Sequence, residues 1–197
     1  MSASGEHRLD RRAAVARLLR DRGGLLVVSG LGSPSYDVMA AGDSPRNFYL
    51  WGAMGAAAMT GLGLALARPD EDVAVITGDG EQLMGLGSLA TIAAQAPRNL
   101  SIVVLDNGLY GETGMQASHT GAGVDLAAMA RAAGFGWSRD VADEAGLDEL
   151  RAWLHRRAGP GFAAVSIGPE EAPRVLPPRD GVELKNRFRR EFGLPTI

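Results

Sequence analysis

The chain has 197 residues, of which 46% are hydrophobic and 27 are glycine, a composition typical of one α/β domain with many tight turns. Its formal net charge of −3 gives no reason to expect binding to nucleic acid or to a membrane surface. Without cysteine the chain has no disulfide, thiolate metal site or thiol nucleophile, and the histidines at positions 7, 119 and 155 are too scattered for an obvious zinc site.

The amino terminus is charged and helical in character, unlike a secretory signal. The longest apolar run, Gly52 to Ala67, is shorter than a membrane span and is interrupted by glycine. We therefore expect a soluble cytoplasmic protein.

Apolar periodicity and glycine or proline breaks predict a doubly wound α/β domain over residues 1–197, with a mainly parallel sheet and helices on both faces. We find no repeat and no interior domain boundary. The predicted elements are a helix over Glu6–Arg22, a strand over Leu25–Ser29, a helix over Ala53–Ala67, a strand over Val73–Thr77, a helix over Gln82–Gln95, a strand over Ile102–Leu105, a helix over Val124–Ala133, a short strand from Trp137, a helix over Asp143–Arg157, a strand over Ala163–Ile167, an irregular arm over Pro169–Pro178 and a closing basic amphipathic helix from Gly181.

The loop after the first strand, Gly30 to Ser35, contains small residues and two hydroxyls. It lacks the third glycine of the dinucleotide fingerprint, because Tyr36 or Asp37 stands where that glycine would be needed. This departure excludes a nicotinamide site here and leaves a plain turn as one reading.

Two later strands each lead to a short oxygen-bearing side chain. Val73–Thr77 leads to Asp79 within a Gly-Asp-Gly turn, and Ile102–Leu105 leads to Asn107. Because ligands bind at the carboxyl ends of parallel strands, both side chains can converge on one ion, and the helix after Gly80 directs free N–H groups at the same place, which suits a phosphate. An oxygen-only ligand set favours Mg²⁺ over zinc or copper.

The Gly-Asp-Gly turn, followed after 26 residues by Asn107, resembles the thiamin diphosphate motif. The segment LDNGLYGETGMQ is similar to that of the sulfopyruvate and phosphonopyruvate decarboxylases of that family. The resemblance implies that Asp79, the Asn107 side chain and the Leu109 carbonyl bind Mg²⁺, which bridges to the diphosphate of the cofactor. The alternative is an ordinary βαβ unit with a glycine turn.

The resemblance also implies which residues contact the cofactor. Gly32 and its neighbours would hold the diphosphate, and the acidic side chain of Glu81 is expected to turn away while its backbone binds. The implied cofactor-binding residues are Gly32, Ser33, Ser35, Gly52, Met54, Gly78, Asp79, Gly80, Glu81, Gln82, Asn107, Leu109 and Tyr110.

The segment Gly52-Ala53-Met54-Gly55 resembles the pyrimidine-binding turn of the family. In that reading the Gly52 carbonyl accepts from the 4′-amino group, the Met54 N–H donates to the ring, and the Met54 side chain holds the two rings in the reactive V shape. An unbranched, polarizable methionine suits this role. The alternative is a core methionine in a helix of small residues.

The stretch Gly108 to Gly123 is predicted to be a polar loop on the cofactor side, where a long loop is usually functional. Gln116 and His119 are candidates for substrate contact or proton transfer, since histidine titrates in the useful range. An exposed histidine without a role is equally compatible with the pattern. Thr113 and Arg46 are further candidates for an anionic substrate.

The resemblance implies a catalytic glutamate on a separate pyrimidine-binding domain, for which this chain has no room. We therefore expect an α-type partner subunit that supplies the glutamate; a partner fused elsewhere and a truncated chain are the alternatives. The leading functional hypothesis is the cofactor-anchoring subunit of a decarboxylase that needs thiamin diphosphate and Mg²⁺ and converts a small anionic 2-oxo acid, 3-sulfopyruvate or 3-phosphonopyruvate, to an aldehyde and CO₂. A carboligase subunit of the acetolactate synthase kind and a non-catalytic subunit that binds Mg²⁺ and diphosphate are the alternatives.

Overall fold

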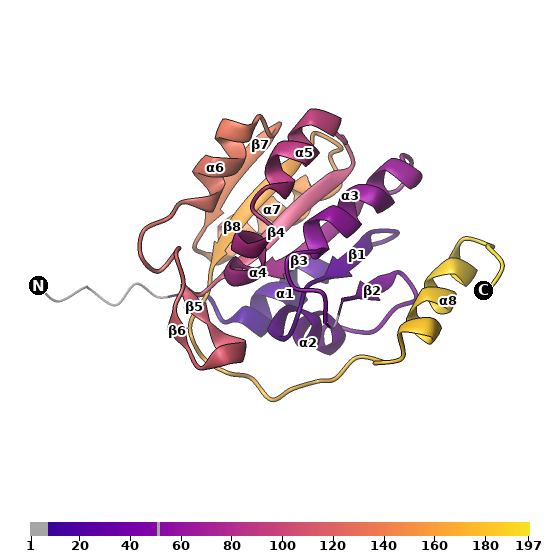
Figure 1. Cartoon of the computed structure of the whole chain (residues 1–197), viewed down its shortest axis with the longest axis horizontal. Coiled ribbons are helices and arrows are strands. Elements are labelled where there is room, and N and C mark those ends of the chain that lie inside the picture. The colour runs from indigo at the N-terminus through magenta and orange to yellow at the C-terminus, as the bar shows by residue number, and fades with distance from the viewer. Residues whose placement is uncertain (1–7, 51) are drawn as a thin grey trace, which may run out of the picture.

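The computed structural model describes residues 8–50 and 52–197. Within them, six strands form one parallel sheet in the order β2-β1-β3-β4-β8-β7 (Figure 1). The predicted residues Glu6 and His7 lie outside the described part of the chain. The strands are β1 (Leu26–Ser29), β2 (Asn47–Tyr49), β3 (Val73–Gly78), β4 (Leu100–Asp106), β7 (Trp137–Val141) and β8 (Gly161–Ser166).

Helices cover both faces of this sheet, which confirms the predicted doubly wound α/β fold (Figure 1). One face packs against α1 (Arg11–Leu19), α2 (Ser33–Ala40) and α7 (Glu144–Trp153), and the other packs against α3 (Ala57–Ala67), α5 (Ser88–Gln95) and α6 (Leu126–Ala133). Because the central strands are buried on both sides, they consist of continuous apolar runs instead of alternating patterns.

The chain changes direction across the sheet at β1. From β1 it continues to β2 on one side through α2, and then returns to β3 on the other side through α3. The connections that leave β1 and β3 therefore run in opposite directions along the sheet. The place between these two strands is a topological switch point, where open α/β sheets bind ligands. The last residue of β3, Gly78, pairs with Leu105, so the turns after β3 and β4 begin at the same level of the sheet.

The predicted helix over Gln82–Gln95 is wrong as a single element. It is divided into α4 (Asp79–Met84) and α5, with Gly85 to Gly87 between them. A β-carbon on Gly85 would lie 2.4 Å from the Gly55 carbonyl oxygen, so the break lets two backbone segments approach closely. Met84, the last residue of α4, is 68% exposed beside this break.

Other boundaries also differ from the prediction. The first helix is shorter, because the Asp10 side chain accepts from the Ala13 N–H at 2.7 Å and so begins α1 at Arg11. Helix α3 begins at Ala57 instead of Ala53. The predicted loop after β4 contains a hairpin of β5 (Leu109–Tyr110) and β6 (Gln116–Ala117), with a 3₁₀ turn, η1 (Gly111–Thr113), between them.

The last segment of the chain crosses the molecule. After β8 the arm runs past the hairpin and beneath α2 to α8 (Gly181–Glu191), which packs beside β2 (Figure 1). None of the helices in residues 8–50 and 52–197 combines the length and the apolar character that a bilayer crossing needs.

Candidate cofactor-binding site

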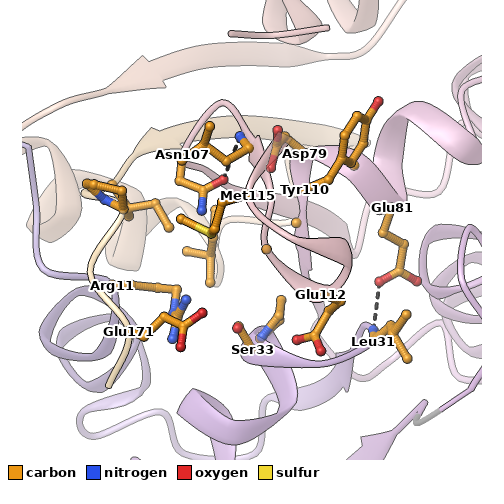
Figure 2. Close-up of a pocket in the computed structure, with 18 of the residues that line it drawn as sticks. Arg11, Leu31, Ser33, Asp79, Glu81, Asn107, Tyr110, Glu112, Met115 and Glu171 are labelled. Atoms are coloured by element: carbon orange, nitrogen blue, oxygen red, sulfur yellow. Dashed lines mark hydrogen bonds between the residues drawn. The ribbon is translucent and has the colours of Figure 1, made fainter. Parts of the chain in front are cut away.

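A cavity opens at the carboxyl edge of the sheet, where the segments after β1, β3, β4 and β8 meet. Figure 2 shows Asp79 and Asn107 on one side of it and Arg11, Ser33 and Glu112 on the other. The residues predicted from sequence that line this cavity are Ser33, Met54, Gly78, Asp79, Gly80, Glu81, Asn107, Leu109, Tyr110 and Thr113. Those that do not line it are Gly32, Ser35, Arg46, Gly52, Gln82, Gln116 and His119.

Asp79 is a buried carboxylate, 3% exposed, at the start of α4. Its Oδ2 accepts a hydrogen bond from the Ser118 hydroxyl and lies 3.0 Å from the Thr120 Oγ1. Burial raises the pKa of Asp79, and the charge of Asp106 raises it further against the opposing effect of the two hydroxyls. Within the described residues, no Arg, Lys or His side chain forms an ion pair with Asp79.

The two hydroxyls around Asp79 make more contacts with oxygen atoms than they have protons to donate. Ser118 contacts Asp79 and Thr120, and Thr120 also contacts Asp79 and lies 2.7 Å from Asp106 Oδ1. These four oxygen–oxygen contacts have only two hydroxyl protons to share when both carboxyl groups are ionised. The two hydroxyls therefore do not offset the negative charge of the cluster, and a cation beside Asp79 would do so.

Asn107 follows β4 and forms a tight turn. Its side-chain Oδ1 accepts the Leu109 N–H at 2.9 Å, while Gly108 at the bend has a φ of +73° that glycine tolerates. The turn places both Asn107 and Leu109 on the cavity, across from the end of β3. Asp79, Asn107 and Leu109 therefore line the same cavity. Within the described chain no group of three His, Asp or Glu side chains is placed to bind a metal ion.

The loop after β1 lies on the opposite side of the cavity. Gly32 has a φ of +70°, and a β-carbon there would lie 2.1 Å from Glu112 Oε1, so the hairpin after β4 packs directly on this loop. Ser33 lines the cavity, but the Ser35 hydroxyl is fully buried and donates to the Gly30 carbonyl at 2.6 Å. The Ser35 side chain is therefore used in a structural hydrogen bond, and a diphosphate contact at this residue stays a prediction.

Glu81 and Gln82 follow the Gly-Asp-Gly turn and are both buried. The Glu81 carboxylate turns toward the backbone, where it accepts the N–H of Leu31 at 2.8 Å and of Ala57 at 3.3 Å (Figure 2). Burial raises the pKa of Glu81 against the effect of these donors. The Gln82 side chain lies 3.4 Å from Ser88 Oγ and points away from the cavity lining.

Met54 and Tyr110 approach the glycine of the turn from two directions. The Met54 side chain, 40% exposed, lines the cavity, and a β-carbon on Gly80 would lie 2.7 Å from the Tyr110 ring and 3.8 Å from the Met54 methyl carbon. Gly80 therefore keeps space open between these side chains. Trp51, next to the Gly52 turn, lies outside the described residues.

The family model for the thiamine pyrophosphate enzyme C-terminal TPP binding domain matches residues 34–167, which include the Gly-Asp-Gly turn and Asn107. The chain belongs to this family. Thiamine pyrophosphate is another name for thiamin diphosphate, so the resemblance of the motif is confirmed.

Two relatives show how much of a thiamine pyrophosphate enzyme this chain spans. It is 40% identical over 183 residues to sulfopyruvate decarboxylase subunit beta of Methanothermobacter thermautotrophicus, covering 93% of this chain and 95% of the relative. It is 46% identical over 192 residues to phosphonopyruvate decarboxylase of Streptomyces hygroscopicus, covering 93% of this chain but 45% of that longer protein.

A solved structure has the same fold as this chain at low sequence identity. Benzoylformate decarboxylase from Polynucleobacter necessarius superimposes with a TM-score of 0.70 at 20% identity, over 88% of this chain and 36% of that one. This likeness concerns the fold alone.

Three residues that the sequence predicts to contact the substrate do not line the cavity. Gln116 is exposed and bonds with Thr113, at 2.9 Å and 3.0 Å. His119 is exposed, and its Nδ1 lies 2.8 Å from the Tyr110 hydroxyl, so it reaches the cavity only through that tyrosine. Arg46 is wrong as a substrate contact, because it is paired with Glu71 and Glu191 away from the cavity.

Sequence reasoning missed the cations that line the cavity. Arg11 lines the cavity, and Arg11 and its neighbour Arg12, which does not, both bind the fully buried Asp37 on α2, Arg12 at 3.0 Å. An acidic residue on a buried helix face requires a cation, and that signal could have identified the pair. Arg174, from the arm, lies with its guanidinium carbon 5.8 Å from the centre of the Tyr36 ring.

Proposed function

We propose that this chain is the cofactor-anchoring subunit of a decarboxylase that depends on thiamin diphosphate and Mg²⁺ and acts on an anionic 2-oxo acid. The single observation that carries the proposal is the buried Asp79 carboxylate, which forms no ion pair within the described residues and lines one cavity with Asn107 at the carboxyl edge of the sheet. Among the relatives, the full-length match to a subunit named sulfopyruvate decarboxylase beta supports the reaction.

In this proposal, Asp79, the second lone pair of the Asn107 amide oxygen and the Leu109 carbonyl hold Mg²⁺, which is well matched by oxygen ligands. The backbone N–H groups at the start of α4 and the loop at Ser33 bind the diphosphate. Met54 supports the rings. The chemistry that the cofactor supplies when bound is addition to the keto carbon and an electron sink for loss of CO₂.

We propose 3-sulfopyruvate or 3-phosphonopyruvate as the substrate, since the named relatives act on these acids. Such a substrate carries a second anionic group and needs a cation near the cavity. Arg174 suits this role better than Arg11, because Arg11 is already paired with Asp37 while Arg174 forms no ion pair within the described residues.

We propose that a second polypeptide of the pyrimidine-binding type completes the site and supplies the activating glutamate. The beta-subunit name of the relative supports such a partner. The exposed Met54 on the cavity rim is consistent with a site that extends beyond this chain.

The test is to co-express this chain with a candidate partner subunit of the pyrimidine-binding type and to measure uptake of thiamin diphosphate by calorimetry with and without Mg²⁺. CO₂ release from sulfopyruvate, phosphonopyruvate and pyruvate is then assayed on the same complex. Magnesium-dependent uptake with CO₂ release from one of the anionic acids is expected. Carbon–carbon bond formation with an added acceptor would instead indicate a carboligase, and uptake without turnover would indicate a non-catalytic subunit.

A further inference from the structure

Glu81 holds an unusual position for a carboxylate. It follows the Gly-Asp-Gly turn directly and is only 6% exposed, yet no Arg, Lys or His of the described chain forms an ion pair with it. A buried charge of this kind is costly unless hydrogen-bond donors surround it. The contacts of Glu81 must therefore account for a buried carboxylate beside this cavity.

The two oxygens of Glu81 are divided between two different segments. Oε2 accepts the Leu31 N–H at 2.8 Å, in the loop between β1 and α2, and Oε1 accepts the Ala57 N–H at 3.3 Å, at the start of α3. Helices α2 and α3 cover opposite faces of the sheet. One carboxylate therefore links, at the switch point, the segments that lead to the two faces.

The surroundings are shaped to admit this carboxylate. A β-carbon on Gly30 would lie 1.9 Å from Glu81 Oε2 and 2.8 Å from the Thr77 hydroxyl oxygen. Gly30 does not have a positive φ, so close approach is the reason that glycine fits here. Figure 2 shows the Glu81 side chain extending beside the cavity to Leu31, away from Asp79 and Asn107.

The linked segments are the two that, in the proposed function, hold opposite ends of the cofactor. Leu31 directly precedes Gly32 and Ser33, the loop on the diphosphate side, and Ala57 follows the Gly52–Met54 turn on the pyrimidine side. We propose that Glu81 is a positioning residue whose side chain fixes the separation of these two segments and so sets the affinity of the assembled enzyme for thiamin diphosphate. This inference rests on the proposed function.

The test compares Glu81→Gln and Glu81→Ala with the unaltered chain, all in the complex with the partner subunit. A glutamine is nearly isosteric, but its NH₂ group would face the N–H donor of one segment, Leu31 or Ala57, so it can accept from only the other. We expect the dissociation constant for thiamin diphosphate at saturating Mg²⁺ to rise about tenfold for Glu81→Gln and more for Glu81→Ala, as for other groups that orient ligand-binding residues. The value of kcat at saturating cofactor should change less than this constant.

A merely structural role is separated by a matched control. Asn99 is 8% exposed at the opposite edge of the sheet and donates to the carbonyls of Ala65, Arg68 and Glu71. Asn99→Ala should lower the unfolding temperature and leave cofactor affinity unchanged. Hydrogen exchange of the Leu31 and Ala57 amides, measured without cofactor, should speed up in the Glu81 variants and not in Asn99→Ala.

Three results would count against the inference. Unchanged cofactor affinity in Glu81→Ala would overturn it while leaving the proposed function intact. The same conclusion would follow if Asn99→Ala lost as much cofactor affinity as Glu81→Ala for the same loss of stability. If the unaltered complex takes up no thiamin diphosphate with Mg²⁺, the proposed function fails and this inference fails with it.

Discussion

At the scale of single residues, Asp79 shows the cost of a buried carboxylate that no cation of the described chain pairs with. Its carboxylate is buried, it shares two hydroxyl protons with Asp106, and burial raises its pKa. The folded chain therefore favours the protonated form more than the unfolded chain does. A bound cation would remove this penalty.

Replacing Asp79 with asparagine should separate stability from binding. Because the pKa of Asp79 is higher in the folded state, the metal-free protein loses stability as the pH rises from the ordinary aspartate range through the raised pKa. Asp79→Asn should abolish that loss, so that its unfolding temperature without metal exceeds that of the unaltered chain at neutral pH. Its affinity for thiamin diphosphate with Mg²⁺ should fall by at least about 100-fold, more than for loss of an outer ligand.

Thermal unfolding across a pH series without metal and calorimetry of the complex measure the two effects. A metal-free Asp79→Asn protein that is less stable than the unaltered chain at every pH would contradict the argument, because it would mean that the charge itself stabilises the fold.

The sequence identifies those site residues that are adjacent to a strand end. Asp79, Asn107 and Leu109 follow from the Gly-Asp-Gly turn, the spacing and the family resemblance, and all three line the cavity. The residues that surround them do not follow from spacing. Ser118 reaches Asp79 across 39 positions of the chain through a hairpin that reads as a polar loop, and nothing local in a sequence reports such a contact.

At the scale of elements, most helices and strands are predicted in their order, but the helix α2, the strand β2 and the break between α4 and α5 are not. Apolar periodicity extends through Gly85 to Gly87 and therefore predicts one helix. The break arises because Gly85 meets the backbone of Gly55, which lies 30 positions away. Propensity and periodicity describe neighbours in the chain, whereas this boundary is set by a neighbour in space.

Gly85→Ala and Gly87→Ala are a matched pair that tests this boundary. A β-carbon at position 85 would lie 2.4 Å from the Gly55 carbonyl oxygen, whereas nothing lies within 4 Å of one at position 87. Overpacking should lower the free energy of unfolding of Gly85→Ala by about 1–3 kcal/mol. Gly87→Ala, with a φ of −60°, should change it by less than about 1 kcal/mol.

Urea unfolding gives both values. Gly85→Ala should also weaken cofactor binding, since Gly55 adjoins Met54 in the turn proposed to hold the rings. Equal stability of the two variants would show that the close approach at Gly55 does not set the boundary between α4 and α5.

At the scale of the whole molecule, the end of the chain is folded back toward the site. Arg46 pairs with Glu191 at 2.7 Å and Arg187 pairs with Asp43 at 2.7 Å, while the Phe48 and Phe188 rings pack edge to face. These contacts hold α8 beside β2, so the arm must pass the cavity to reach it. The sequence predicts an arm and a packing helix but not this path, because its anchors lie up to 145 positions apart.

The path of the arm places Arg174 on the cavity, and this leads to a prediction about substrate choice. Loss of a hydrogen bond to a charged group costs about 1.5–3 kcal/mol, roughly tenfold or more in an equilibrium constant. Arg174→Gln should therefore raise the KM for the anionic 2-oxo acid about tenfold, leave activity on pyruvate little changed and leave the affinity for thiamin diphosphate unaltered. Arg179→Gln is the control, because Arg179 is an exposed residue near the end of the same arm that does not line the cavity.

The comparison of substrates makes this prediction specific. If Arg174 acted only by holding the arm in place, its loss would affect pyruvate and the anionic acid alike, because both would enter the same loosened cavity. If it contributed only a general positive field, Arg179→Gln would have a similar effect and rising salt would remove the difference between the variants. A direct contact between Arg174 and the second anionic group predicts that KM rises for the anionic acid alone. It also predicts that this rise persists at about 0.15 M salt.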